Sequence, residues 1–367
     1  MKRRFCLCGW VATVVWLASG NLSGNEFLAP PDAGKFAVTD PAQVDADFAY
    51  QGEYAGSVFE PRRGWLWTGL QVIARGDGKF DAVQYRGGLP GAGWDRQTKR
   101  SLAGELRDNV LALNAEDGGS VIADGQSASV YGSDGRLRGT LIKRQRVSPT
   151  LHAAAPHNAL VLFDGTSADQ FNGAKVTEDG LLDVGGVTKV PVHDFRLHLE
   201  FRLPYMPYAT GQGRGNSGVY IQQRYEVQVL DSFGLEGVAN ECGGLYRQQA
   251  PDVNMCLPPL VWQTYDIWFT AARFDDAGNK IANARITLLH NGVAVHDHRE
   301  IPTKTGAGKP ESAEWLPILL QNHSNPVRFR NIWIVLEPEL EKAAPCRKPG
   351  RCRPLRNLLK RVRCGRR

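Results

Sequence analysis

The sequence predicts an all-β protein in which a small β-rich domain precedes an antiparallel jelly-roll sandwich. Apolar residues occur in short runs of Val, Leu, Ile and aromatic side chains, a pattern typical of strands. The chain has 40 Gly and 21 Pro, which favour turns between such runs. From residue 158 onward no helical period is sustained and strands do not alternate with helices, which excludes a doubly wound α/β sheet.

The first 20 residues have the pattern of a signal peptide. Lys2, Arg3 and Arg4 precede an apolar stretch that ends at Ala18, and small residues follow up to position 20. The apolar stretch has about 14 residues, whereas a membrane span needs roughly 20. We therefore expect export to a periplasmic or extracellular location, with no membrane span after cleavage. An uncleaved anchor is the alternative.

Two linkers divide the chain that follows. Residues 21–45 are rich in Ala, Pro, Gly and Asp, and residues 149–158 are rich in Ala and Pro. Between them, residues 46–148 are expected to form the small β-rich domain, because turn signals such as Gly-Asp-Gly at 76–78 separate strand-like runs. The pattern of residues 95–113 is more helical or irregular.

Three tryptophans of the small domain have two interpretations. Trp65, Trp67 and Trp94 could stack on sugars. Aromatic side chains of this kind more often fill a core or a domain interface. We expect the second arrangement, with sugar stacking as the alternative.

Residues 159–338 are predicted to form the jelly-roll sandwich. Strand-like segments recur at regular spacing, as in antiparallel sheets. The alternation of polar and apolar residues over 193–202 predicts a strand whose solvated face carries His198 and Glu200. The predicted strands cover residues 160–163, 195–203, 218–223, 225–230, 264–270, 284–289, 318–321 and 328–335.

The net charge of +6 is distributed unevenly. Residues 2–4 contribute +3 and residues 346–367, with ten Arg or Lys and no acid, contribute +10, so subtracting these 13 charges from +6 leaves −7 for the rest. This distribution excludes an evenly basic nucleic-acid-binding domain. We expect a basic, disordered tail over 339–367, and adhesion of this tail to a polyanionic surface is the alternative.

The cysteines allow two arrangements in the folded part. Export permits disulfides. Cys242 and Cys256 either form a disulfide or are two buried free thiols. Cys346, Cys352 and Cys364 lie in the tail, and their spacing does not match a zinc ribbon or finger.

The segment Tyr-Glu-Val-Gln-Val-Leu-Asp-Ser at 225–232 is the most informative candidate site. Strand alternation places Glu226 and Gln228 on one face. Asp231 can join them only through a bend or bulge at the strand end. Two carboxylates and an amide within six residues can supply an acid–base pair and a clamp for hydroxyl groups.

A second polar segment follows a predicted strand near the end of the domain. His323 lies in a turn among amides, and the returning strand carries Arg328 and Arg330 on one face. A lone His in a turn is usually only exposed, but these neighbours favour a functional interpretation. Gln321 ends the first of these two strands.

Several other motifs are excluded or weak. The Gly-rich segment 213–218 lacks the helix and Lys of a phosphate loop, so it is a tight turn or a loop that carries Asn216 over a concave face. His290, His296 and His298 are spaced too irregularly to favour a zinc site. No cofactor is predicted, and binding of a divalent metal is left open.

Residues 160–338 resemble the 3-keto-disaccharide hydrolase domain family, whose fold is a concanavalin A-like lectin and glucanase sandwich. Segments typical of this family occur in its order along about half of the chain. They are residues 162–166, 194–195, 216–220, 226–231, 243–246, 262–266, 291–292 and 320–332. The chain departs from the family pattern at Ser324, where the family usually has Gly, and at 277–282 and 310–315.

The resemblance implies cleavage of a glycoside already oxidised to a ketone at C3. Removal of the C2 proton would precede departure of the glycosidic oxygen from C1. Glu226 or His323 would take the proton, and Asp231 would orient or donate. The implied substrate-binding residues, with Arg328 polarising the ketone, are Asn216, Arg224, Gln228, Tyr246, Gln263, Gln321 and Arg328.

Two other functions remain open. The same sandwich commonly serves as a non-catalytic lectin, because fold alone does not determine activity. The chain could also be a structural envelope protein anchored by its basic tail. In the enzyme and lectin interpretations the expected partner is a carbohydrate.

Overall fold

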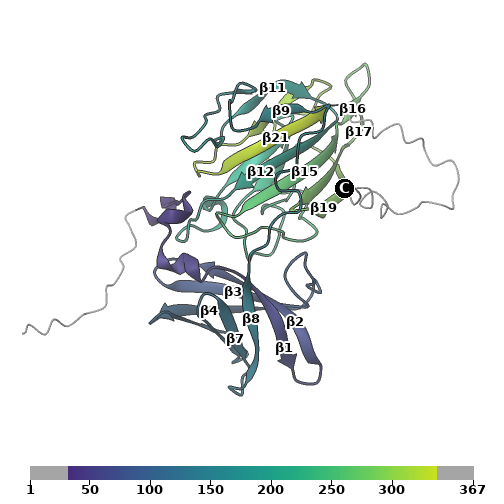
Figure 1. The fold of residues 1–367 in the computed structure, drawn as a ribbon. Helices are drawn as coiled ribbons and strands as arrows, with labels where there is room; N and C mark the ends of the chain where they lie inside the picture. Colours follow the sequence, from purple (N-terminus) through teal and green to yellow (C-terminus); the bar gives the residue numbers. More distant parts are fainter. Residues whose placement is uncertain (1–31, 337–367) are drawn as a thin grey trace, which may run out of the picture.

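The structure of the protein, a computed structural model, describes residues 32–336 (Figure 1). The expected signal peptide, the basic tail after residue 338 and Cys346, Cys352 and Cys364 lie outside the described residues. Within the described part, no helix has the length and apolar character needed to cross a membrane. Three short 3-10 helices come first and a fourth lies in the second domain: η1 (Ala33–Lys35), η2 (Pro41–Gln43), η3 (Ala46–Ala49) and η4 (Gly211–Gly213).

The first eight strands form a closed antiparallel barrel in sequential order, and the eighth pairs back with the first. Alternate side chains of these strands fill the barrel interior. Gly104 allows one close strand contact, since a Cβ there would lie 1.8 Å from the carbonyl oxygen of Ala112. The strands are β1 (Gly52–Glu60), β2 (Gly64–Ala74), β3 (Lys79–Arg86), β4 (Lys99–Arg107), β5 (Val110–Asn114), β6 (Ser120–Ala123), β7 (Ser127–Tyr131) and β8 (Leu137–Arg144).

The expectation of helical or irregular structure over 95–113 was wrong, because most of this stretch forms β4 and β5. The two strands are joined at Asp108 and Asn109, which have φ values of 50° and 60°. Asp and Asn tolerate this left-handed conformation, which two-residue hairpin turns require. Leu102 and Leu111 then point into the barrel, where both are buried.

Two antiparallel sheets form a sandwich after the barrel. The apolar side chains that face one another between the sheets make its core. The all-β fold class is confirmed. The five-stranded sheet has the order β10 (Phe171–Asn172), β11 (Val187–Val192), β20 (Leu316–Leu320), β13 (Ser217–Ile221) and β14 (Tyr225–Val229). The six-stranded sheet has the order β19 (Val293–Ile301), β18 (Ala284–His290), β15 (Trp262–Thr270), β12 (Phe195–Arg202), β21 (Arg328–Leu336) and β9 (Leu160–Phe163), and β16 (Arg273–Phe274) pairs with β17 (Lys280–Ala282).

The barrel packs directly against one end of the sandwich (Figure 1). Tyr205 and Leu260, from loops of the sandwich, belong to the apolar core of the barrel, and Ile73 of β2 belongs to the core of the sandwich. Trp94 also packs against the sandwich core, as expected for an interface residue. The buried carboxylate of Glu53 accepts a hydrogen bond from Arg146 Nε at 2.6 Å, just before the connection to the sandwich.

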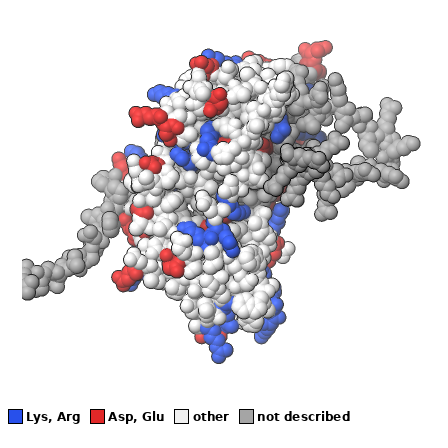
Figure 2. All heavy atoms as spheres, viewed as in Figure 1, with Lys and Arg blue, Asp and Glu red and all other residues white. Residues whose placement is uncertain are grey.

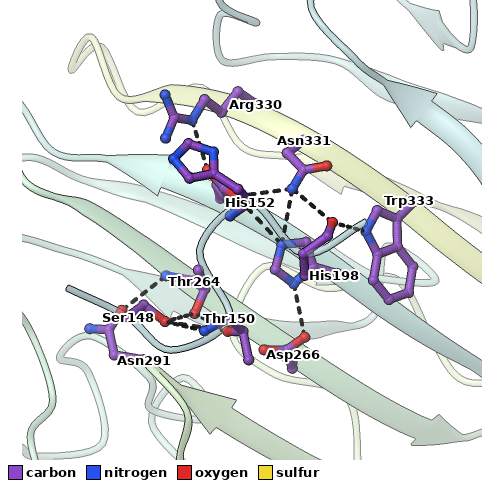
Figure 3. A network of polar contacts seen from close by, with 12 residues as sticks. Ser148, Thr150, His152, His198, Thr264, Asp266, Asn291, Arg330, Asn331 and Trp333 are labelled. Atoms are coloured by element: carbon purple, nitrogen blue, oxygen red, sulfur yellow. Dashed lines mark hydrogen bonds and ion pairs between the residues drawn. The ribbon is translucent and has the colours of Figure 1, made fainter. Parts of the chain in front are cut away.

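The predicted solvated face of β12 was wrong, because His198 and Glu200 are fully buried. The segment that connects the barrel to the sandwich crosses the outer face of the six-stranded sheet and covers them (Figure 3). The backbone N–H of His152 donates to Glu200, and the carbonyl oxygen of Ala153 accepts from Trp333 Nε1 at 3.1 Å. A strand pattern cannot show that a distant segment will cover its polar face.

Buried polar groups beneath this segment form hydrogen bonds with one another. His198 Nδ1 lies 2.8 Å from Asp266 Oδ1, and Arg330 Nε donates to Glu200 at 2.7 Å. Burial alone would raise the pKa of Glu200, but hydrogen bonds from His198, Asn331 and Arg330 lower it to about 2. Burial likewise disfavours protonated His198, but Asp266 and Glu200 raise its pKa above the usual value.

Candidate functional site

The candidate site lies on the outer face of the five-stranded sheet, over β13 and β14. In the ladder of these strands, Tyr220 pairs with Glu226 and Gly218 pairs with Gln228. The intervening Val227 points between the sheets and is fully buried in the core. Alternation therefore places the side chains of Tyr220, Glu226 and Gln228 on the face opposite the core.

Glu226 is a buried carboxyl group at the centre of this face. Its side chain is held by Tyr220, whose hydroxyl donates to Oε2 at 2.7 Å. Burial raises the pKa of Glu226 to about 7, although the hydrogen bond from Tyr220 acts in the opposite direction. Gly218 provides the space for this carboxyl group, because a Cβ at that position would lie 2.6 Å from Oε1.

The loop between β19 and β20 covers Glu226. The backbone N–H of Glu226 donates to Thr305 Oγ1 at 2.7 Å. Next in the loop, Gly306 lies against the ring of Tyr246, and a Cβ at 306 would come within 2.9 Å of that ring. Gln248 Nε2 donates to the carbonyl oxygens of residues 303 and 304. Glu226 is consequently only 2% exposed in this closed arrangement.

Three buried amide groups around this site have oxygen atoms without a hydrogen-bond donor in the described part of the chain. They are Oδ1 of Asn216, Oε1 of Gln228 and Oε1 of Gln321. Their nitrogen atoms are used: Asn216 and Gln228 both donate to Gln212, and Gln321 Nε2 lies 3.5 Å from the hydroxyl of Tyr220. Buried acceptors without donors are unfavourable, so they suit a ligand that brings hydroxyl groups.

Asp231 does not lie on this face. Its Oδ2 accepts a hydrogen bond from the buried Arg214 at 2.5 Å, and its Oδ1 accepts from the backbone N–H of Phe233. Its negative charge disfavours ionisation of the core thiols of Cys242 and Cys256, which are buried and free. The bend after β14 thus pairs Asp231 with Arg214 instead of bringing it to Glu226.

Arg224 also has a different environment from the one expected. It ends the turn between β13 and β14, where Gln222 and Gln223 have φ values of 51° and 52°. Its guanidinium donates to the carbonyl oxygens of Pro310 and Glu314, both at 2.9 Å. Arg224 therefore holds residues 310–314, which lie within one of the departures from the family pattern.

Gln263 and Arg328 are likewise placed elsewhere. Gln263 lies on β15 of the other sheet, where its Oε1 accepts from the backbone N–H of Leu257 at 2.9 Å and lies 2.9 Å from His290 Nε2. Arg328 forms a 2.6 Å ion pair with Asp183. Both side chains are satisfied by residues far apart in the sequence, which no local pattern indicates.

His323 is exposed, in the loop between β20 and β21. The same loop contributes Gln321 to the site, and Asn325 Oδ1 accepts from the backbone N–H of Asn216 at 2.7 Å. His323 therefore lies near the edge of the site, while Glu226, Gln228, Asn216, Gln321 and Tyr246 meet within it.

Sequence reasoning missed Tyr220, Gln212 and the covering residues Thr305 and Gly306. Tyr220 could have been found, because it lies two residues after Gly218 and so shares its strand face. Gln212 lies in the short 3-10 helix η4, and Thr305 and Gly306 lie on a connecting loop, so none of the three has a periodic pattern. Only the folded chain brings them to Glu226.

No group of three or more His, Cys, Asp or Glu within residues 32–336 is arranged to hold a metal ion. His290 is paired with Gln263, and His296 Nε2 lies 2.8 Å from the carbonyl oxygen of Gly243. Burial is the main cause that lowers the pKa of both imidazoles. They are neutral core residues.

Residues 158–335 match the 3-keto-alpha-glucoside-1,2-lyase-like domain family. Three solved structures of Parabacteroides distasonis ATCC 8503 proteins that carry the provisional designation glycosyl hydrolase are similar to this part of the chain. Their sequence identities are 34%, 18% and 23%, with TM-scores of 0.44, 0.37 and 0.34. The matches cover 49%, 49% and 48% of this chain and 84%, 95% and 98% of those chains. No curated protein matches the chain.

Proposed function

The sandwich domain belongs to the 3-keto-alpha-glucoside-1,2-lyase-like family, and we propose that the protein is an exported enzyme that cleaves glycosides oxidised to a ketone at C3. The family makes the chain a glycosyl hydrolase-like, carbohydrate-active protein. The oxidised substrate and the catalytic residue are our proposals. The observation that carries them is a buried carboxyl group, Glu226, with a pKa of about 7.

The reaction begins at C2 of the sugar. A ketone at C3 acidifies the C2 proton, so a modest base can remove it. The electrons of the broken C2–H bond form a C1–C2 double bond, the C1–O bond breaks, and the leaving oxygen takes up a proton. Addition of water to the double bond completes the hydrolysis.

Glu226 suits the role of this base. A carboxyl group with a pKa near neutrality is largely deprotonated just above pH 7 and is a stronger base than an ordinary carboxylate. Tyr220 fixes its orientation through the 2.7 Å hydrogen bond to Oε2. Once protonated, Glu226 can return the proton to the leaving oxygen.

The surrounding amides suit a sugar. The unpaired oxygens of Asn216, Gln228 and Gln321 can each accept a hydrogen bond from a hydroxyl group. Since Glu226 is 2% exposed, the loop that carries Thr305 and Gly306 has to move aside for a sugar to enter. Closure of this loop afterwards would exclude water and keep the raised pKa of Glu226.

The experiment incubates the full chain with 3-keto-glucosides and with their unoxidised parents and follows aglycone release. We expect release only from the oxidised substrates and its loss in Glu226→Gln. Glu300→Gln is the matched control, because Glu300 is an exposed carboxylate of β19 paired with Arg285. Release from neither substrate, with sugar binding retained, would refute the enzyme and support the lectin alternative.

A further inference from the structure

The barrel has an open end with a cavity that neither the family match nor the proposed reaction uses. Its volume is about 570 Å³, and strands β1, β2, β3, β4, β7 and β8 contribute to its wall. Cavities of this size hold small molecules in other proteins. The family match begins at residue 158, so this site belongs to the barrel alone.

Two arginine–carboxylate pairs line the cavity. Arg86 Nε lies 3.0 Å from Glu60 Oε1, and Arg100 Nη1 lies 3.1 Å from Asp117 Oδ2. All four side chains remain partly exposed. Arg86 Nη2 and Arg100 Nε make no hydrogen bond to any residue between 32 and 336, so both guanidinium groups keep donors available.

The remaining cations of the lining are also paired. Lys99 forms an ion pair with Glu236 of the sandwich, and Arg138 lies 2.8 Å from Asp134. In Figure 2, Lys and Arg side chains gather at the lower end of the barrel. Each cation of this lining has a carboxylate partner, which offsets part of its positive charge, although Glu60 and Asp134 are shared with Arg63 and Arg136.

An exposed aromatic surface adjoins the cavity. Phe59 lines it, and the ring of Trp65 meets Phe59 edge-on with 5.7 Å between the ring centroids. Trp65 and Trp67 are 66% and 48% exposed. Contrary to expectation, neither side chain fills the core or a domain interface. Two exposed Trp residues together are uncommon on a soluble protein unless they bind a partner or ligand.

We propose that the open end of the barrel binds a neutral saccharide. Neighbouring hydroxyl groups of a sugar can donate to a carboxylate and accept from the adjacent arginine, and the pairs Arg86–Glu60 and Arg100–Asp117 offer both roles. The apolar face of a sugar ring packs on Phe59 and Trp65. Because this site needs no oxidised sugar, it is independent of the proposed reaction at Glu226.

The test uses the full chain and unoxidised sugars, with titration calorimetry and tryptophan fluorescence as readouts. The probes are maltotriose and cellotriose, with glucuronic acid as the charged comparison. We expect at least one neutral trisaccharide to bind with a Kd of about 1 mM or tighter. Arg100→Ala and Trp65→Ala should each weaken this binding by about tenfold or more.

Arg75→Ala is the matched control, because Arg75 pairs with Asp81 at 2.6 Å and does not line the cavity. This variant should bind as the parent does. Trp65→Ala keeps the test valid if Arg100→Ala fails to fold, since Trp65 contributes little to the core. The proposal would be overturned if the parent bound neither trisaccharide or preferred glucuronic acid. It would also be overturned if Arg100→Ala and Trp65→Ala both bound the trisaccharide as tightly as the parent. None of these outcomes bears on the proposed cleavage of 3-keto-glucosides, which is tested separately at Glu226.

Discussion

Replacement of Glu226 by Gln is expected to reduce turnover strongly and to stabilise the protein at alkaline pH. Burial raises the pKa of this carboxyl group from the usual 4.5 to about 7. The folded state therefore favours the protonated form. The stabilisation that the protonated Glu226 carboxyl contributes is complete below pH 4.5 and is lost as the pH rises through about 7. Gln keeps the size and hydrogen-bonding capacity of the protonated carboxyl and cannot ionise.

The size of the effect follows from the two pKa values. A difference of one between the folded and unfolded pKa corresponds to about 1.4 kcal/mol, so the difference between 4.5 and about 7 corresponds to about 3 kcal/mol. The free energy of unfolding of the variant should exceed that of the parent by roughly this amount at about pH 8.5, and by less than about 1 kcal/mol at about pH 5. Glu226 is 2% exposed, so solvent screening changes this value little.

Urea unfolding of parent and variant at the two pH values measures the free energy of unfolding. Turnover of a 3-keto-glucoside should fall by roughly two orders of magnitude or more in the variant, and that of the parent should rise as the pH passes about 7. Glu300→Gln should change neither quantity. An equal stability difference at both pH values would refute a raised pKa for the buried Glu226 carboxyl. Unchanged turnover in a folded variant would refute Glu226 as the base.

Three further predictions concern other parts of the chain. Glu200→Gln should destabilise the protein by about 3 kcal/mol in thermal or urea unfolding, because it breaks a buried network with Arg330 and the connecting segment; a change within about 0.5 kcal/mol would indicate a solvated side chain. The mature protein should begin near Asn21 by N-terminal sequencing, and an intact Met1 on naturally expressed protein would contradict cleavage. Deletion of 343–367 should leave folding and sugar cleavage unchanged but weaken adsorption to heparin in a salt-dependent way; a deletion that unfolds the protein would show that the tail is packed.

Strand alternation is a local property, and the sequence predicted it well around the site. The pattern of residues 225–229 placed Glu226 and Gln228 on one face and Val227 on the other, as the β13–β14 ladder shows. The fold class followed from the same kind of signal. Where the chain bends, the prediction failed: Asp231 lies just beyond β14, and its partner Arg214 could not be identified from spacing.

The all-β fold class, the alternation of side chains along the strands that were recognised and the family of the sandwich domain could be predicted from the sequence, because these depend on near neighbours and ordered motifs. What covers each face depends on the tertiary structure. The connecting segment buries Glu200, where hydrogen bonds lower its pKa to about 2, and the loop at Thr305 covers Glu226, whose pKa rises to about 7. Two glutamates on regular strands thus acquire opposite chemistry, because burial and hydrogen bonding come from segments far away in the chain.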